Sequence, residues 1–426
     1  MLFWKVFYNL LIIPSLTLFA LAGSLFHTKL RQGTLGRLKT VKLLKIFSKT
    51  VKSGQDVYWF HAASFGEFEQ IRPVLKGLKE IEPECIVVVS FFSPSGFNNV
   101  IDENLDCKIY LPFDYPWLLN KVFTIVKPKK LILAAYDVWP NLIWTAKKMG
   151  IHSTLFAARF SKGTSKLLPI VNSFYRSVYG CFSAIYTITE ADHAFLQGFL
   201  YPTGRPIVRT LGNPRYDQVK TSADKFTKER TESVLLRQKR LIAGSVHSED
   251  NQVILDSIIS LLKEVHDLSL LWVPHEPTER VVKAAESVFS EIGFSVTRLG
   301  SAQWDKLNKF RVIIVDSVGK LSTLYWEAQI AYVGGGFSSG VHNVMEPAIA
   351  RLPVFFGPRF KNSHEADELI NSRGGFTIST GAELFLGIKQ LLMNREDFLK
   401  VSFAATNVIH RNLGSSTRVV RNLIHD

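Results

Sequence analysis

Short apolar runs alternate along most of the chain with segments in which apolar residues recur every three or four positions. Runs such as Val57–His61 and Cys85–Phe91 read as strands, and helices are expected at Glu67–Leu78, 97–103 and Pro140–Lys148. The alternation restarts at Arg240, with an acidic helix start at 248–250 and a further strand pattern at 268–273. Strand and helix signals in this order predict two α/β halves, each with a parallel sheet that helices cover on both faces.

A polar, charged stretch at 212–239 separates the two halves and predicts a linker with an exposed helix. We therefore expect an N-terminal Rossmann-like domain at 56–215 and a C-terminal Rossmann-like domain at 240–400. The remaining residues, 401–426, are expected to form a C-terminal helix that packs back on the N-terminal domain.

The start of the chain is organised differently. Residues 7–26 form an uncharged, mostly apolar run of about the length that a bilayer core requires. Eight basic residues follow between 29 and 52, which predicts a cytoplasmic location for everything downstream. We expect a membrane anchor at 1–28 and a basic linker at 29–55. A cleaved signal peptide and a helix lying in the membrane interface are the alternatives.

Composition narrows the class of partner. The chain has 426 residues, 46% of them apolar, which is enough for two ordinary domains. Lys and Arg outnumber Asp and Glu by 51 to 37, and a net charge of +14 suits a membrane surface or a phosphorylated substrate. The basic residues are scattered, so nucleic acid ranks below those two. Cys85, Cys107 and Cys181 are odd in number and lack C-x-x-C spacing, which favours a reducing compartment without disulfides.

The stretch at 333–348 predicts a strand, a three-glycine turn and a helix N-terminus. Asn343 is a suitable N-cap, Glu346 is spaced to reach back to it, and Pro347 would lie in the first turn. Free backbone N–H groups at such a place suit an anion, and a plain strand-to-helix turn is the alternative. His342 favours a binding site, because the turn does not require it.

Three more strand ends in the second half carry small, polar or glycine residues before a helix: Gly244–His247, Pro274–Pro277 and Asp316–Gly319. Together they predict a crevice lined by helix N-termini, which suits a nucleotide. His275-Glu276 and His364-Glu365 do not extend to a His-Glu-x-x-His motif, so no metal is expected. No P-loop motif is present, which argues against a P-loop NTPase.

In the first half, Glu67 opens a helix just beyond a strand, where parallel sheets bind their ligands. The alternative is a carboxylate that only complements the helix dipole, worth about 0.3–1 kcal/mol. Two halves with such strand-end loops suit a cleft transferase of the GT-B type. A two-domain dehydrogenase or epimerase fits the same pattern.

Taken in chain order, these motifs resemble one family, the 3-deoxy-D-manno-octulosonic acid (Kdo) transferases of lipopolysaccharide assembly. The landmarks run from the anchor into the C-terminal half: His61–Glu67, Ser93–Gly96, Tyr110–Asp114, Trp139–Asn141, Ala158–Ser161, Gly212-Asn213, Gly244–His247, Asp316–Gly319, Val333–Gly336, His342-Asn343 and Glu346-Pro347.

The resemblance implies a GT-B glycosyltransferase with two Rossmann-like domains, an active-site cleft between them and an N-terminal membrane-anchor helix. It implies transfer of Kdo, with inversion and without cofactor or metal, from CMP-Kdo to a glucosamine hydroxyl of a lipid A precursor (lipid IVA). The location would be the cytoplasmic face of the bacterial inner membrane, in contact with its lipid and without a nucleic acid partner. Glu67 matches the family's general base, with Asp137 as a second acidic residue.

The same resemblance divides the binding residues between the domains. The N-terminal acceptor domain would use Ser64, Gly66 and Arg159. The C-terminal domain would bind the CMP-sugar donor through Ser245, His247, His275, Arg280, Ser317, Val318, Gly319, Gly335, Gly336, His342, Asn343 and Glu346.

The sequence departs from the family pattern at two motifs and at Val341, which stands in place of a glycine before His342. Ala135-Tyr136-Asp137 stands where the family has Glu-Thr-Glu, and His275-Glu276-Pro277 stands where it has Arg-His-Pro. His275 or Arg280 must then replace an arginine at the donor phosphate. A UDP-sugar transferase or epimerase, and a non-catalytic membrane-bound nucleotide- or lipid-binding protein, remain as alternatives.

Overall fold

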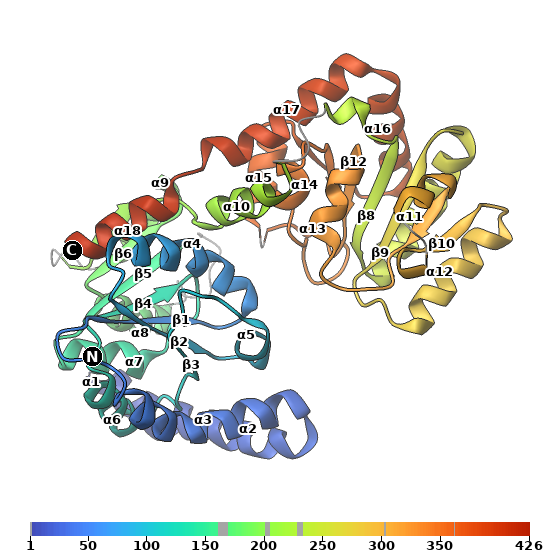
Figure 1. The fold of residues 1–426 in the computed structure, drawn as a ribbon. Helices are drawn as coiled ribbons and strands as arrows, with labels where there is room; N and C mark the ends of the chain where they lie inside the picture. Colours follow the sequence, from blue (N-terminus) through green and yellow to red (C-terminus); the bar gives the residue numbers. More distant parts are fainter. Residues whose placement is uncertain (1, 161–168, 201–204, 228–232, 302–303, 362) are drawn as a thin grey trace. The chain divides into compact units, whose positions relative to one another are not determined.

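The structure, a computed structural model, describes residues 2–160, 169–200, 205–227, 233–301, 304–361 and 363–426. It divides into two compact units (Figure 1): one contains the residues up to Gln218 together with Leu413–Asp426, and the other contains Val219–Asn412. Each unit is built on a parallel sheet of seven strands. The prediction of two α/β halves is confirmed.

The sheet of the first unit has the strand order β3-β2-β1-β4-β5-β6-β7. All neighbours are parallel, and the strands are β1 (Val57–Ala62), β2 (Ile86–Phe91), β3 (Cys107–Tyr110), β4 (Lys130–Ala134), β5 (His152–Ala158), β6 (Ala184–Thr187) and β7 (Ile207–Thr210). The chain moves outward from β1 to β3 and then returns to the other side of β1 with β4. The loops that leave β1 and β4 therefore diverge, and such a switch point is where open α/β sheets bind ligands.

Helices cover both faces of this sheet. One apolar cluster joins it to α4 (Phe65–Ile81) and to α18 (Ser415–His425), whose Val419, Val420 and Leu423 are buried. The cluster on the other face joins it to α6 (Pro116–Val126), α7 (Pro140–Lys148), α8 (Pro169–Tyr179) and α9 (Glu190–Phe199). The unit also contains α5 (Pro94–Asn99) and the start of α10 (Arg215–Thr227).

The basic segment expected to be a linker is largely a helix, α3 (Thr28–Phe47). Gly33, Thr40 and Leu44 lie on a buried side of this helix. The Thr40 hydroxyl donates to the carbonyl of Tyr110 at 2.8 Å, and a Cβ at Gly36 would lie 2.2 Å from the Tyr110 ring. Small residues let α3 pack closely on the sheet edge, so the linker prediction was wrong for this segment.

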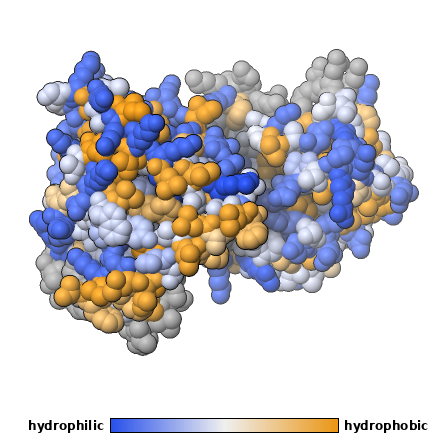
Figure 2. Space-filling model, turned by 90° about the horizontal axis from the view of Figure 1, so that it is seen from below, coloured by the Kyte–Doolittle hydropathy of each residue, from blue (hydrophilic) through white to orange (hydrophobic). Residues whose placement is uncertain are grey.

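The apolar N-terminal run forms α1 (Leu2–Phe7), a π-helical turn η1 (Tyr8–Ile12) and α2 (Ile13–Phe26). Together they make one helix long and apolar enough to cross a membrane, with mean hydropathy 1.8 and only 6% of its most apolar window buried. Its first part is attached to the α/β unit: the Tyr8 hydroxyl donates to Asp114 Oδ2 at 2.9 Å, and the side-chain amides of Asn9 and Asn141 are paired. The view from below shows hydrophobic side chains gathered on this side of the unit (Figure 2).

The sheet of the second unit has the order β10-β11-β9-β8-β12-β13-β14. Its strands, also parallel, are β8 (Arg240–Val246), β9 (Ser269–Pro274), β10 (Val296–Arg298), β11 (Val312–Ile314), β12 (Ile330–Val333), β13 (Val354–Phe356) and β14 (Gly375–Thr377). Here the chain moves outward from β8 and then returns to its other side with β12. The switch point of this unit therefore lies between the ends of β8 and β12.

Seven helices follow strands or close the described part of this unit: α11 (Ser248–Glu264), α12 (Glu279–Glu291), α13 (Leu321–Leu324), α14 (Met345–Ile349), α15 (His364–Asn371), α16 (Gly381–Met393) and α17 (Arg395–Arg411). Short 3-10 turns are η3 (Val234–Leu236), η4 (Leu299–Ser301), η5 (Trp304–Lys309) and η6 (Tyr325–Glu327).

Candidate active site and nucleotide site

Glu67 lies in the first turn of α4, immediately after the loop that leaves β1. Its Oε2 accepts a hydrogen bond from the backbone N–H of Ala63 at 2.6 Å, which holds the carboxylate over the end of the strand. Burial raises the pKa of Glu67 to about 7; the Ala63 N–H opposes this shift and the charge of Asp137 adds to it. A carboxylate with this pKa is suited to accept a proton near neutral pH.

Asp137 lies beyond β4, on the other side of the switch point. Its Oδ2 is 2.9 Å from Nε2 of His61, the fifth residue of β1. The other ring nitrogen of His61 lies 3.0 Å from the carbonyl oxygen of Ser90 and 2.9 Å from its Oγ. Burial opposes ionisation of Asp137, but the hydrogen bond and charge of His61, with a contribution from Arg37 of α3, lower its pKa overall. Asp137 is therefore a fixed negative charge beside Glu67.

The expected acceptor residues lie at strand ends of the same unit. Ser64 is the N-cap residue of α4, and Gly66 is exposed in its first turn. Arg159 directly follows β5, and Ser161 of the same motif lies outside the described residues. Glu67, Ser64 and Gly66 are neighbours in one turn, whereas Arg159 comes from a loop two strands further along the sheet order.

The glycine stretch of the second unit is organised by Asp250, in the first turn of α11. Its carboxylate is buried and accepts from three backbone N–H groups, those of His247 (3.0 Å), Gly335 (2.7 Å) and Phe337 (3.4 Å), and from the Tyr332 hydroxyl (2.8 Å). One side chain thus ties the end of β8 to the loop after β12.

Close packing explains the glycines. Gly335 has φ +89°, and a Cβ there would lie 2.4 Å from the Gly340 carbonyl oxygen and 2.9 Å from the His342 ring. A Cβ at Gly336 would lie 2.5 Å from the backbone of Gly357. The loop closes on itself, because the N–H of His342 donates to the carbonyl of Gly334 at 3.1 Å. His342 is therefore returned to the end of β12.

The structure brings together three of the predicted donor residues, His247, His275 and His342. Nε2 of His247 lies 2.7 Å from Nε2 of His342. The ring of His275 lies nearly parallel to both, with centroids 4.1 Å from that of His247 and 4.7 Å from that of His342. His247 and His275 also line a cavity of about 660 Å³ between α11 and α12, together with Arg280.

Two other predicted donor residues follow a different strand of this sheet. Ser317 and Val318 come after β11, where Val318 is 79% exposed and the next residue, Gly319, has φ +83°. The Oγ of Ser317 is buried and has no hydrogen-bond partner among the described residues. Ser245, near the end of β8, has φ +55°, a left-handed conformation that is uncommon for a residue with a side chain.

The predicted contact of Glu346 with Asn343 is confirmed, but the N-cap lies one residue later than predicted. The N-cap of α14 is Val344, and this helix has only five residues. Asn343 lies one position earlier: its Oδ1 accepts from the N–H of Met345 at 3.1 Å, and its Nδ2 donates to Glu346 at 2.9 Å. The contact therefore joins the side chain of Asn343, in the loop before α14, to the side chain of Glu346 in the first turn of this helix.

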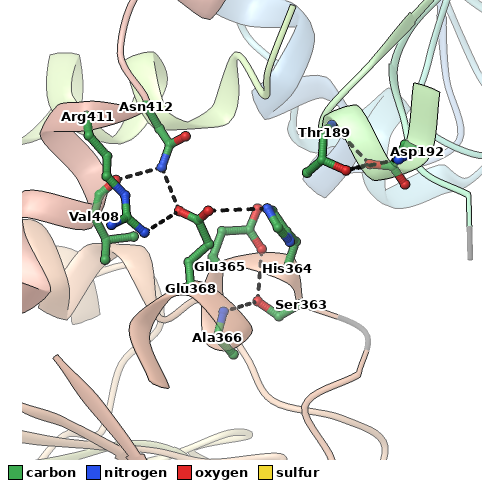
Figure 3. Close-up of polar contacts among 10 residues, drawn as sticks. All are labelled: Thr189, Asp192, Ser363, His364, Glu365, Ala366, Glu368, Val408, Arg411 and Asn412. Carbon is green, nitrogen blue, oxygen red and sulfur yellow. Dashed lines mark hydrogen bonds and ion pairs between the residues drawn. The ribbon is translucent and has the colours of Figure 1, made fainter. Parts of the chain in front are cut away.

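The second His-Glu pair has a structural explanation (Figure 3). Glu365 accepts from the hydroxyl of Ser363, the N-cap of α15, at 2.8 Å. Nε2 of His364 lies 3.6 Å from Glu368, which also accepts from Arg411 and Asn412 at the end of α17. These contacts hold α15 against α17.

Two residues that organise these sites were not predicted from the sequence. His61 was assigned only to a strand, and Asp250 only to an acidic helix start. A polar residue within an otherwise apolar strand is the available signal for His61, since a buried imidazole requires partners. Asp250 follows His247 at capping-box spacing, which marks the helix start but does not indicate the distant loop that it holds.

Comparison with known proteins supports the family resemblance that the sequence motifs carry. A model of the family described as 3-Deoxy-D-manno-octulosonic-acid transferase (kdotransferase) matches residues 36–218. The 3-deoxy-D-manno-octulosonic acid transferase of Chlamydophila psittaci is 30% identical over 329 residues, which cover 75% of this chain and 73% of the relative. The chain belongs to the Kdo transferase family. The enzyme of that name from Aquifex aeolicus is 27% identical over 362 residues, covering 83% of this chain and 92% of the relative.

Solved structures show the fold of this Kdo transferase. The UDP-GlcNAc 2-epimerase of Neisseria meningitidis superposes with a TM-score of 0.63 at 15% identity, covering 87% of this chain and 100% of the epimerase. This likeness confirms the GT-B fold class expected from the sequence. Family membership makes the protein a glycosyltransferase that transfers Kdo in lipopolysaccharide biosynthesis.

Proposed function

We propose that this Kdo transferase moves Kdo from CMP-Kdo to a glucosamine hydroxyl of a lipid A precursor, lipid IVA, with inversion and without a bound metal. Glu67 is the general base. The observation that carries this assignment is the half-buried Glu67 carboxylate in the first turn of α4, with a pKa of about 7 and the negative charge of Asp137 nearby.

The chemistry requires such a group. A sugar hydroxyl is a poor nucleophile, and a carboxylate within hydrogen-bond reach can accept its proton as the new bond forms, which contributes about 10²–10⁴ in rate. At pH 7 a Glu67 with a pKa near 7 is substantially ionised and still basic enough to hold a proton. Ser64, Gly66 and Arg159 are proposed to position the acceptor near it.

The donor nucleotide is proposed to bind at the strand ends of the second unit. The N–H groups and small residues of the loops after β8, β11 and β12 suit a phosphate and a nucleotide. Support comes from the buried Oγ of Ser317, which lacks a partner among the described residues, and from the cluster of His247, His275 and His342. Arg280, which lines the adjacent cavity, is the guanidinium proposed to face the donor.

The acceptor is a lipid, and the N-terminal helix is proposed to hold the enzyme at the inner membrane with both α/β units on the cytoplasmic side. Exposed apolar residues along Leu2–Phe26 and the basic residues of α3 support this orientation. Lipid would contact the same helix.

A transfer assay with radiolabelled Kdo, supplied as CMP-Kdo to purified protein and lipid IVA, tests the proposal. Glu67→Gln should lower the rate of product formation by about 10²–10⁴-fold, while thermal shift still detects CMP and UDP gives the smaller shift. Glu69→Gln is the matched control, because Glu69 lies on the same helix and pairs with Arg72. Near-normal transfer by the Glu67 variant would remove Glu67 from its role, and absence of transfer by the wild type would reject the proposed substrates.

A further inference from the structure

The three histidines of the second unit form a defined arrangement. The Nε2 atoms of His247 and His342 are 2.7 Å apart, their ring centroids are 5.0 Å apart and the planes differ by 17°. The two imidazoles therefore meet head to head. His275 lies against both rings, with interplanar angles of 17° and 26°.

Two ring nitrogens at this distance share one proton. Two N–H groups cannot point at each other, and two lone pairs would repel, so one Nε2 donates and the other accepts. A neutral pair can bind one further proton at an outer ring nitrogen, Nδ1, without breaking this bond. A second added charge would place two imidazolium rings in contact, with His275 stacked beside them, which Coulomb repulsion opposes.

Charges of both signs face the cluster. The acidic residues are Asp250 and Glu249 of α11 and Glu276 after β9. The basic residues are Arg280, in the first turn of α12, and Arg359, whose charge interacts with that of Glu249. The Asp250 carboxylate already accepts four hydrogen bonds, so much of its charge is compensated.

Burial, together with the neighbouring histidines, lowers the pKa of His342 to about 4 and also lowers that of His275. At neutral pH these two rings are therefore uncharged in the free protein. An entering phosphate therefore meets two uncharged imidazoles, those of His275 and His342, that can become cationic.

We propose that the His247–His342 pair, capped by His275, takes up one proton from solvent when a nucleotide phosphate binds beside it. The imidazole pair becomes an imidazolium–imidazole pair, and no covalent bond changes. The inference rests on the proposed binding of CMP at this site and goes beyond it, because it makes donor-site affinity dependent on pH. When CMP leaves Kdo, its phosphate gains a negative charge, and the stored proton lies where that charge develops.

Calorimetric titration of the full-length protein with CMP tests whether the protein takes up a proton on binding. The second pKa of a phosphate monoester is about 6, so at pH 7.5–8.5 free CMP is already a dianion and any proton taken up belongs to the protein. Titrations in two buffers with different ionisation enthalpies should show an uptake approaching one proton. The association constant should fall by up to about tenfold per pH unit over this range.

Two variants locate the proton. His247→Gln combined with His342→Gln should lose at least half of the uptake, because amides do not titrate here. His275→Arg supplies a permanent charge, so CMP should still bind and its affinity should become nearly independent of pH. His266→Gln is the control, since His266 is an exposed histidine of the same unit and should leave the uptake unchanged.

The outcomes separate the two proposals. CMP binding without proton uptake, or uptake that persists in both the double variant and His275→Arg, overturns the inference and leaves the proposed function intact. If the double variant does not fold, a pH-dependent affinity in His275→Arg overturns it. Absence of CMP binding to the wild-type protein overturns both.

Discussion

Nε2 of His61 lies 2.9 Å from Oδ2 of Asp137, although 76 positions separate the two residues in the chain. The contact crosses the switch point of the first sheet, because β1 and β4 are adjacent there. His61 is buried within its strand, whereas Asp137 belongs to a loop. Strand β1 thus fixes the position of the Asp137 carboxylate on its loop. The negative charge of that carboxylate contributes to the raised pKa of Glu67.

The pH profile of transfer should report Glu67. As a general base it must be deprotonated, so kcat/KM should rise with pH and level off above the pKa of about 7. Initial rates from pH 5 to 9, at low acceptor concentration and with CMP-Kdo kept saturating at every pH, give this rising part of the profile. The Glu67→Gln variant should be about 10²–10⁴-fold slower, and its residual rate should not rise with pH over this range. A wild-type profile that is flat between pH 5.5 and 8 contradicts the assignment.

Asp137→Asn should shift the rise of kcat/KM with pH to lower pH. The charge of Asp137 raises the pKa of Glu67, so its removal makes Glu67 more acidic, although burial still holds its pKa above the ordinary value. The rate should fall as well, because His61 exchanges a charged partner for a neutral one. The same rate measurements apply, and Asp102→Asn is a control in the same unit, paired with Arg72. An unchanged or raised apparent pKa would show that Asp137 does not act on Glu67.

Asp250→Asn should destabilise the second unit and weaken CMP binding. An amide has one acceptor oxygen, whereas the carboxylate accepts four hydrogen bonds, so at least one N–H or hydroxyl loses its partner. Hydrogen bonds to charged groups contribute about 1.5–3 kcal/mol each, and we expect a loss of roughly 3 kcal/mol. Thermal unfolding with and without CMP measures both effects. Asp256→Asn, at an exposed position of the same helix, should leave the Tm unchanged.

The apolar pattern of the sequence predicted part of the fold. Apolar periodicity located most long strands and helices, because burial on one or both faces determines it; Pro140–Lys148 was predicted with its observed bounds. It failed for β13 and β14, which have three residues each and lie toward the edge of their sheet. The helix expected at 97–103 occurs at Pro94–Asn99, since Pro94 can occupy a first turn and Ser93 caps it.

Local patterns indicated the loops of the candidate sites but not their internal contacts. The glycine stretch at 333–348 was recognisable, yet its organiser, Asp250, is 85 positions from Gly335. Likewise, no spacing rule pairs His61 with Asp137. Both contacts arise because parallel strands far apart in sequence end side by side at a switch point, which a periodic pattern does not specify.

Gly335→Ala should disturb the nucleotide loop more than its left-handed backbone alone explains. A residue with a side chain in this conformation costs about 1–2 kcal/mol. The new Cβ would also lie 2.4 Å from the Gly340 carbonyl oxygen and 2.9 Å from the His342 ring. Gly293→Ala is a matched control, because Gly293 has φ +94° and open space around it. We expect a larger fall in Tm for Gly335→Ala and CMP binding weakened by about tenfold or more. Equal effects of the two substitutions on both measurements would refute the steric argument.

The N-terminal helix should behave as a membrane anchor that charged residues can disable. Leu18 and Phe19 of α2 are 68% and 69% exposed, and a charged side chain at the centre of a membrane helix costs about 2.5–3.5 kcal/mol. Leu18→Asp with Phe19→Asp should therefore shift the protein from the salt-washed membrane fraction to the soluble fraction. Tyr8, Asn9 and their partners lie elsewhere on the chain, so the α/β unit should remain folded. Leu236→Asp, at a 74% exposed position of the second unit, should leave the distribution unchanged. Wild-type protein recovered intact in the salt-washed soluble fraction would reject the anchor, because a helix held in the membrane by apolar contact is not released by salt.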